Sequence, residues 1–84
     1  MYYGEACPHC HELIKFIKEN NYEDIFNIAY KEVYYNETNK NELMSVAKKC
    51  NLNTNSIGVP FVYYKGKCYI GVPDIEAIFT RGRS

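Results

Sequence analysis

The chain has no tryptophan, only three prolines and no net charge, because its ten basic and ten acidic side chains cancel. A chain without excess positive charge has no electrostatic attraction to nucleic acids or to anionic membranes. No apolar run approaches the roughly 20 residues that a membrane-spanning helix needs. These absences exclude nucleic-acid-binding and membrane-spanning proteins from the function classes that the sequence supports.

The composition is that of one small folded domain. Hydrophobic residues make up 46% and aromatic residues 15% of the 84 residues, which is typical of a chain that folds. No repeat, linker or low-complexity segment interrupts it. We therefore predict a single domain over residues 1–80 and a tail at 81–84. No signal peptide precedes the first cysteine, Cys7, so we expect a cytoplasmic protein.

The sequence Cys7-Pro8-His9-Cys10 stands directly before an apolar stretch with helical spacing. Pro8 suits the first position of a helix, where its missing N–H is not needed. A thiol at such a helix N-terminus is favoured as a thiolate by the unpaired backbone N–H groups and by the helix dipole. Thiolates attack disulfides and bind soft metals, and structural disulfides are rare in the cytoplasm. The motif therefore indicates a redox site or a metal-binding site.

The periodicity of the remaining chain predicts the element order β-α-β-α-β-β-α. For the second helix, Asn39 with Glu42 three residues later is one candidate N-terminal cap, and Thr38 is the other. We expect Cys50 and Cys68 to pack as small apolar side chains. The expected elements are a strand at 1–3, a helix from Pro8 that stops at 20–21, a strand at 28–35, the second helix, strands at 59–64 and 68–71 around a turn at 65–67, and a last helix capped by Asp74.

This order resembles the thioredoxin-like superfamily over nearly the whole chain. The C-x-x-C motif follows the first strand directly, and Val59-Pro60 opens the third strand, as a Val-Pro or Ile-Pro pair does in that superfamily. The short chain is most similar to glutaredoxins. The resemblance implies a three-layer α/β fold with a four-stranded mixed sheet. It also implies a cis peptide bond before Pro60, which would face the dithiol and leave the Val59 backbone free to pair with an extended substrate.

The activity that the resemblance implies is dithiol–disulfide exchange. Cys7 would be the nucleophile, and Cys10, one turn into the helix and more buried, would resolve the mixed disulfide. His9 is the third predicted catalytic residue, because Cys-Pro-His-Cys resembles the motif of the strongly oxidising DsbA-type proteins. We expect a couple more oxidising than that of thioredoxin. The predicted substrate-binding residues are Pro8, Val59, Pro60 and Asp74.

We expect protein or peptide disulfides as partners. The protein itself is expected to be a monomer without a tightly bound cofactor. Glutathione is a candidate co-substrate, and glutathione or a reductase is a candidate electron donor. Gly4 stands where glutaredoxins often carry a basic residue that holds glutathione, and the Gly-Gly-x-Thr-Asp segment is shortened to residues 71–74. Asp74 could still receive the glutathione amine, although a helix cap is its more economical role. We therefore expect weak use of glutathione.

Two other kinds of site share this cysteine spacing, and the sequence leaves them open. Cys7-x-x-Cys10-His11 also matches the attachment signature of c-type haem, with His11 as the axial ligand. Zinc could be held by Cys7, Cys10 and His11 with Cys50 or Cys68 as the fourth ligand. An iron–sulfur cluster could be shared between two chains. Absorbance near the Soret region and metal analysis distinguish these alternatives from a dithiol.

Overall fold

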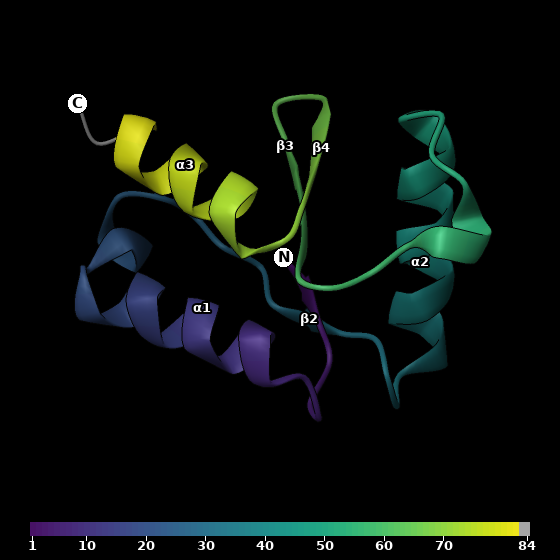
Figure 1. Cartoon of the computed structure of the whole chain (residues 1–84), viewed down its shortest axis with the longest axis horizontal. Helices are drawn as coiled ribbons and strands as arrows, with labels where there is room; N and C mark the ends of the chain where they lie inside the picture. The colour runs from purple at the N-terminus through teal and green to yellow at the C-terminus, as the bar shows by residue number, and fades with distance from the viewer. Residues whose placement is uncertain (83–84) are drawn as a thin grey trace.

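The computed structural model describes residues 1–82, in which a four-stranded sheet lies between two layers of helix (Figure 1). Helices α1 (Pro8–Glu19) and α3 (Val72–Gly82) lie on one side of the sheet, and α2 (Glu37–Lys49) lies on the other. Two short 3₁₀ helices, Tyr22–Asp24 and Thr54–Ser56, follow α1 and α2. The predicted order of strands and helices and the predicted α/β class are confirmed.

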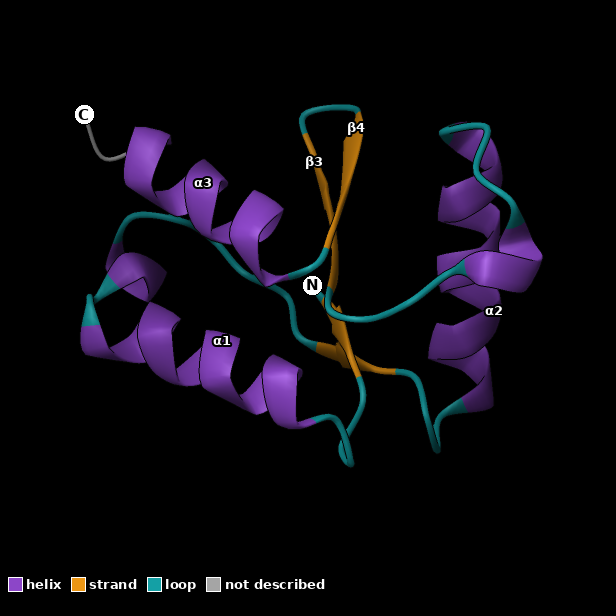
Figure 2. Ribbon diagram, viewed as in Figure 1, coloured by secondary structure: helices purple, strands orange, loops and turns teal. Residues whose placement is uncertain are grey.

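The sheet is mixed, as predicted. Its strands β1 (Tyr2–Tyr3), β2 (Lys31–Glu32), β3 (Phe61–Tyr64) and β4 (Lys67–Ile70) lie in the order β2-β1-β3-β4 (Figure 2). β1 pairs in parallel with β2, after the crossover through α1, and antiparallel with β3. β3 and β4 form a hairpin whose turn residues Lys65 and Gly66 have φ values of 50° and 79°. Positive φ at both turn positions matches the twist of a two-residue hairpin.

The second strand is much shorter than predicted. The sequence predicts a strand at 28–35, but only Lys31 and Glu32 form one. β2 has a single neighbour, the two-residue β1, so its ladder has no partner beyond that length. The Glu32 carboxylate then accepts the backbone N–H groups of Tyr34 and Tyr35, which turns the chain away from the sheet. The predicted length is wrong because local β propensity cannot supply a partner strand.

Helix α2 begins earlier than predicted, because Asn36 rather than Asn39 or Thr38 is its N-cap. The Asn36 Oδ1 accepts the Asn39 N–H at 3.0 Å and satisfies one of the free donors of the first turn. Glu42 closes no capping box. Its carboxylate binds the Lys31 ammonium at 2.6 and 2.8 Å and so ties α2 to β2.

Helix α3 also starts before the residue expected to cap it. Asp74 is predicted as the cap, but α3 begins at Val72, and the Gly71 carbonyl accepts the first helical bond from the Ile75 N–H at 3.2 Å. Gly71 has a φ of 91°, a conformation that glycine adopts at little cost. Asp74 instead lies in the first turn, where a carboxylate interacts favourably with the helix dipole.

The helices contain 12, 13 and 11 residues. Within residues 1–82, none of them is long and apolar enough to cross a membrane. Helix α3 continues to Gly82, two residues into the predicted tail at 81–84. Residues 83–84 of that tail lie outside the described residues.

Two apolar clusters fix the helices on the sheet, one on each face. Since α1 and α3 share one face, they share one cluster, whereas α2 packs alone on the other. The cluster under α2 consists of Tyr2, Val33, Leu43, Val46 and Phe61, and that under α1 and α3 of Leu13, Ile17, Tyr22, Ile75 and Phe79. Burial of these side chains from water is the main favourable term in the stability of such a domain.

Cys50 and Cys68 are joined in a disulfide, so the prediction that they pack as separate apolar side chains is wrong. Cys50 is the C-cap of α2, and Cys68 lies in β4 with its sulfur toward the α2 face, 3.9 Å from the Val46 carbonyl. The bond therefore ties the end of α2 to the edge strand. The spacing of the two cysteines along the chain did not reveal this pairing because it depends on how α2 lies across the sheet.

Replacing both Cys50 and Cys68 with alanine should lower the free energy of unfolding by about 3 kcal/mol. The bond spans 18 positions of sequence, and opening it restores the freedom of that loop in the unfolded chain. Urea denaturation followed by circular dichroism measures the change. Each single alanine variant should lose about as much as the pair, since either one removes the bond. An unchanged midpoint in the double variant would contradict a stabilising role.

Candidate functional site

Cys7 is the N-cap of α1, and its sulfur takes the place that a serine or aspartate oxygen usually has. Its backbone is extended, with φ −99° and ψ 105°, and its Sγ accepts the Cys10 N–H at 3.2 Å. Pro8 occupies the first helical position, as predicted. A negative charge on this sulfur would lie at the positive end of the helix dipole and against a backbone donor. The geometry therefore favours Cys7 as a thiolate once the pair is reduced.

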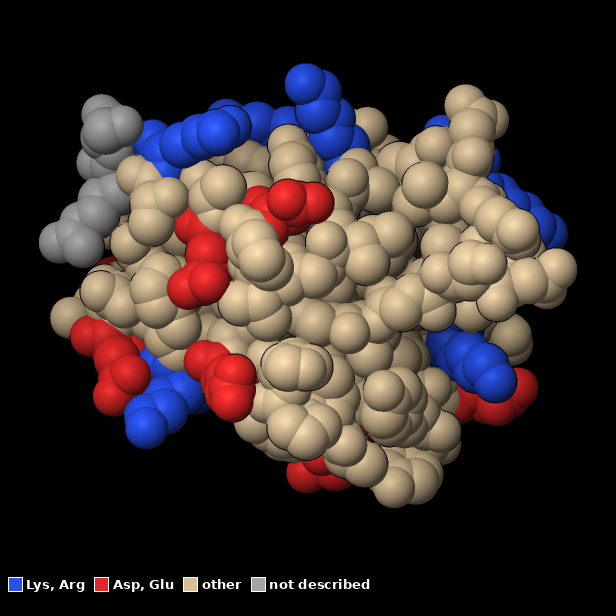
Figure 3. Space-filling model, in the orientation of Figure 1, with Lys and Arg blue, Asp and Glu red and all other residues tan. Residues whose placement is uncertain are grey.

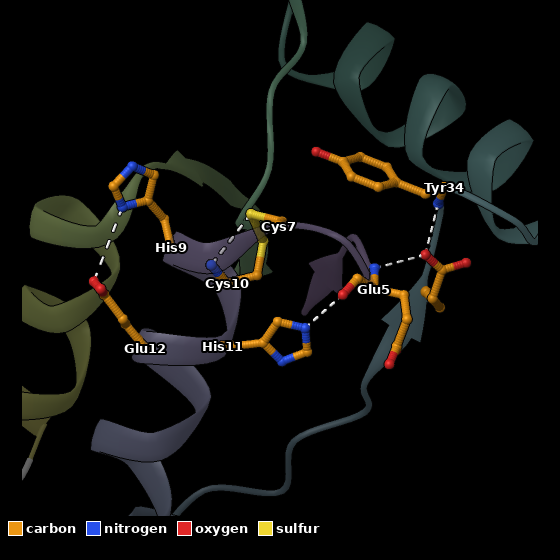
Figure 4. The surroundings of a disulfide bond; sticks show 8 residues. Glu5, Cys7, His9, Cys10, His11, Glu12 and Tyr34 are labelled. Atoms are coloured by element: carbon orange, nitrogen blue, oxygen red, sulfur yellow. Dashed lines mark hydrogen bonds and ion pairs between the residues drawn. A yellow bond between two sulfur atoms is a disulfide. The ribbon is translucent and has the colours of Figure 1, made fainter.

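The two motif cysteines form a disulfide across the first turn of α1 (Figure 4). Cys10 is completely buried, whereas 7% of Cys7 remains exposed. Cys7 is therefore the sulfur through which a disulfide in solution can reach the pair.

The loop that leads into the motif is held from two sides. The Gly4 carbonyl accepts the Cys7 N–H at 3.0 Å, and the Glu5 N–H donates to the Glu32 carboxylate of β2 at 2.9 Å. From α1, the His11 Nε2 donates to the Glu5 carbonyl at 2.6 Å (Figure 4). His11, the axial ligand of the haem interpretation, thus uses its Nε2 to anchor this loop.

Glu32 is the functional residue that sequence reasoning missed. Besides the Glu5 N–H, its carboxylate accepts the N–H groups of Tyr34, Tyr35 and Asn36 at 2.9, 2.8 and 3.2 Å. Although desolvation of the carboxylate would raise the pKa of Glu32, these backbone hydrogen bonds lower it below its ordinary value. An acidic residue inside the strand predicted at 28–35 gives no sign of such a role, because the donors come from two separate loops.

His9 does not lie against the disulfide. Its imidazole is 76% exposed, and its Nδ1 is 3.9 Å from a carboxylate oxygen of Glu12, one turn further along α1. Figure 4 shows the ring directed away from the Cys7 and Cys10 sulfurs. Of the three predicted catalytic residues, the structure brings the two cysteines together and leaves His9 on the surface of the helix.

The segment before β3 carries the cis peptide bond predicted between Val59 and Pro60. Pro60 is fully buried, and its carbonyl accepts the Gly71 N–H at 3.0 Å, which joins this segment to the start of α3. β1 and β3 are antiparallel and pair at Tyr2 and Phe61, so Val59, two residues before Phe61, lies on the same side of this pair as Gly4, two residues after Tyr2. Val59 therefore lies at the end of the sheet from which the Cys7 loop departs.

The backbone of Val59 has unused hydrogen-bonding capacity. Neither its N–H nor its C=O has a hydrogen-bond partner among the residues that the structure describes. A strand edge with free donors and acceptors can pair with an extended peptide. Asp74, in contrast, is exposed in a groove between α3 and the β3–β4 hairpin, and neither motif cysteine lines that groove.

The described part of the chain contains no group of three or more His, Cys, Asp or Glu side chains placed to hold a metal ion. The predicted zinc set needs Cys50 or Cys68 as a fourth ligand, and in this structure these two are bonded to each other.

Comparisons of the chain with models of protein families, with curated proteins and with solved structures found no match.

Glu32→Gln should lower the melting temperature at neutral pH. One carboxylate oxygen of Glu32 accepts the N–H groups of Glu5 and Tyr34, and the other accepts those of Tyr35 and Asn36. The substitution replaces one of these oxygens with an amide NH₂, which cannot accept, so two backbone N–H groups lose their acceptor. The pKa of Glu32 is lowered in the folded state, so its contribution is present above its unfolded pKa and is lost as the pH falls through the folded pKa. The difference from wild type should shrink on acidification.

Thermal melts of both proteins, at about pH 7 and about pH 3, on either side of the ordinary pKa of a glutamate, measure this difference. Glu19→Gln, at an exposed position of α1, is the matched control and should change neither melt. Equal melting temperatures for wild type and Glu32→Gln at neutral pH would show that the four backbone bonds do not stabilise the fold.

Proposed function

We propose that the protein is a thiol–disulfide oxidoreductase with a thioredoxin-like fold, most similar to glutaredoxins. The observation that carries the proposal is the Cys7 sulfur at the N-cap of α1, bonded to Cys10 at the end of the sheet where Val59 offers a free backbone edge. The mixed four-stranded sheet between helical layers supports the same family. No observation of the described residues favours haem or a metal centre over this function.

Reduction of the disulfide gives a dithiol whose two sulfurs differ in environment. The Cys7 sulfur keeps the Cys10 N–H and the helix N-terminus as stabilising partners, so it carries the thiolate. The Cys10 sulfur is enclosed, so it does not meet a substrate from solvent and reacts only with the Cys7 sulfur beside it.

Exchange then proceeds in two displacements. The Cys7 thiolate attacks one sulfur of a substrate disulfide, forms a mixed disulfide and releases the other substrate sulfur as a thiolate. The Cys10 thiol attacks the Cys7 sulfur and passes its proton to the departing substrate sulfur, which closes the Cys7–Cys10 bond and releases the second substrate sulfur as a thiol. Two electrons pass from the protein dithiol to the substrate disulfide. Run in reverse, the same steps oxidise a substrate dithiol.

The substrate class that fits this site is a disulfide within an extended polypeptide. Pairing with the Val59 backbone would align such a segment beside the 7% of Cys7 that is exposed. Pro8, which is exposed next to Cys7, would border the segment without offering an N–H donor that competes for it, whereas Pro60 is buried behind Val59. Glutathione fits this site less well as a substrate, because Gly4 provides no basic group for it and Asp74 lies in a different groove. The monomeric state and the cytoplasmic location remain proposals from the sequence.

Cys7→Ser should abolish exchange, whereas Cys10→Ser should accumulate a mixed disulfide with the substrate, because only the resolving step is lost. Incubation of each reduced variant with a peptide disulfide, followed by intact-mass measurement, detects the adduct. Cys50→Ser with Cys68→Ser is the matched control and should retain exchange. An adduct on Cys7→Ser and none on Cys10→Ser would reverse the two roles.

We further propose that in the reduced protein the His9 imidazole turns from Glu12 toward the Cys7 thiolate and stabilises it. His9→Tyr should then lower the reduction potential of the Cys7–Cys10 couple by at least about 30 mV, a tenfold change in its equilibrium constant. Equilibration with a redox buffer of known potential measures the shift. Glu12→Gln removes only the competing carboxylate and should not lower the potential. An unchanged potential in His9→Tyr would leave His9 without a catalytic role.

A further inference from the structure

Tyr34 lies beside the loop that presents Cys7, and its ring contacts the backbone of Gly4 directly. A Cβ placed on Gly4 would lie 2.4 Å from two atoms of the Tyr34 ring, so the ring fills the space that a side chain at residue 4 would take. The Gly4 carbonyl in turn accepts the Cys7 N–H. Figure 4 shows the ring extending over this loop toward Cys7, with the hydroxyl at its far end.

The ring of Tyr34 is held in place and is nevertheless open to solvent. Its backbone N–H is fixed by the Glu32 carboxylate at 2.9 Å, and one face of the ring rests on Gly4. Even so, 51% of the residue is exposed. Its hydroxyl has no hydrogen-bond partner among residues 1–82. A large aromatic side chain that is already ordered loses little conformational entropy when a partner covers it.

The charged groups beside Tyr34 are acidic: the Glu32 carboxylate accepts its N–H, and Glu5, which follows Gly4, is exposed. On the face of the molecule drawn in Figure 3, uncharged side chains cover most of the surface, and many of the acidic and basic side chains lie toward its edges. β1 and β3 pair at Tyr2 and Phe61, so Val59 lies on the same side of this pair as Gly4, the residue on which the ring lies. A peptide strand paired with Val59 would therefore pass the exposed side of Tyr34 as it crosses Cys7.

We propose that Tyr34 is a specificity-determining residue that contacts the side chain next to the attacked cysteine and selects an apolar or aromatic residue there. The inference rests on the proposed exchange activity and narrows its substrates to polypeptide disulfides with an apolar neighbour. The ring supplies a preformed apolar surface, and its contact with an aromatic side chain adds to the area buried. A small charged disulfide such as that of glutathione gains nothing from this surface.

The test compares two cyclic peptide disulfides that differ only beside one cysteine, Phe in one and Ser in the other, with 2-hydroxyethyl disulfide as a substrate that has no flanking residue. The second-order rate constant for oxidation of the reduced protein is measured with each. Wild type should prefer the Phe peptide by about 3- to 10-fold. Tyr34→Ala should lose this preference and keep its rate constant with 2-hydroxyethyl disulfide. Tyr34→Phe should keep the preference for the Phe peptide and the rate constant with 2-hydroxyethyl disulfide.

Tyr35→Ala is the matched control, because Tyr35 also donates its N–H to Glu32 and is 77% exposed, but its ring does not rest on Gly4. It should retain the preference. An independent measurement uses the Cys10→Ser variant trapped with the Phe peptide, in which the ring resonances of Tyr34 should shift and those of Tyr35 should not.

The outcomes distinguish a failure of the proposed role of Tyr34 from a failure of the proposed exchange activity. Equal rates with the Phe and Ser peptides in wild type, or equal losses with all three disulfides in Tyr34→Ala, would overturn the role of Tyr34 and leave the exchange activity standing. Unshifted Tyr34 resonances in the trapped complex would do the same. No reaction of wild type with any disulfide would overturn the exchange activity and the selectivity with it.

Discussion

The position of the cysteine motif depends on one carboxylate, that of Glu32. It accepts four backbone N–H groups from two loops that are far apart in sequence, the loop before Cys7 and the turn before α2. Backbone donors left without partners are costly, and neither loop belongs to the sheet, so no ladder could satisfy them. The Glu32 side chain, at the end of β2, thus links the motif loop, the backbone of Tyr34 and the start of α2, and His11 anchors the motif loop from α1.

Three segments of the backbone meet near this carboxylate and form the site. The end of β1 provides Gly4, the start of α1 provides the N–H that caps the Cys7 sulfur, and the segment before β3 provides the free edge of Val59. His11 closes the arrangement by binding the Glu5 carbonyl from α1. Most of these contacts use backbone groups, so the chemistry of the site needs few side chains beyond the two sulfurs.

The features that could be predicted from sequence are those encoded locally. Pro8 after a cysteine specifies a helix start, and the pair Val59-Pro60 at a strand start pointed, through the resemblance, to the cis bond. The features missed depend on distant partners. The length of β2 is limited by β1, the cap of α2 is Asn36 because Glu32 ends the strand there, and Cys50 meets Cys68 only after α2 packs across the sheet. Glu32 itself has no local signature, since its four donors come together only in the folded chain.

The two disulfides differ in what the fold loses when each opens. When Cys7–Cys10 opens, Cys7 can remain the N-cap of α1 and Gly4 still accepts its N–H, so the dithiol has a framework that does not require the bond. When Cys50–Cys68 opens, no comparable framework of backbone hydrogen bonds remains in place of the bond. The chain between them, 51–60 above all, has few backbone bonds to the rest of the fold, chiefly Leu52 to α2 and Pro60 to Gly71. This segment includes Val59, which packs against the apolar cluster under α2. The first bond can therefore open while its framework of backbone contacts remains, whereas the second contributes mainly to the stability of the fold.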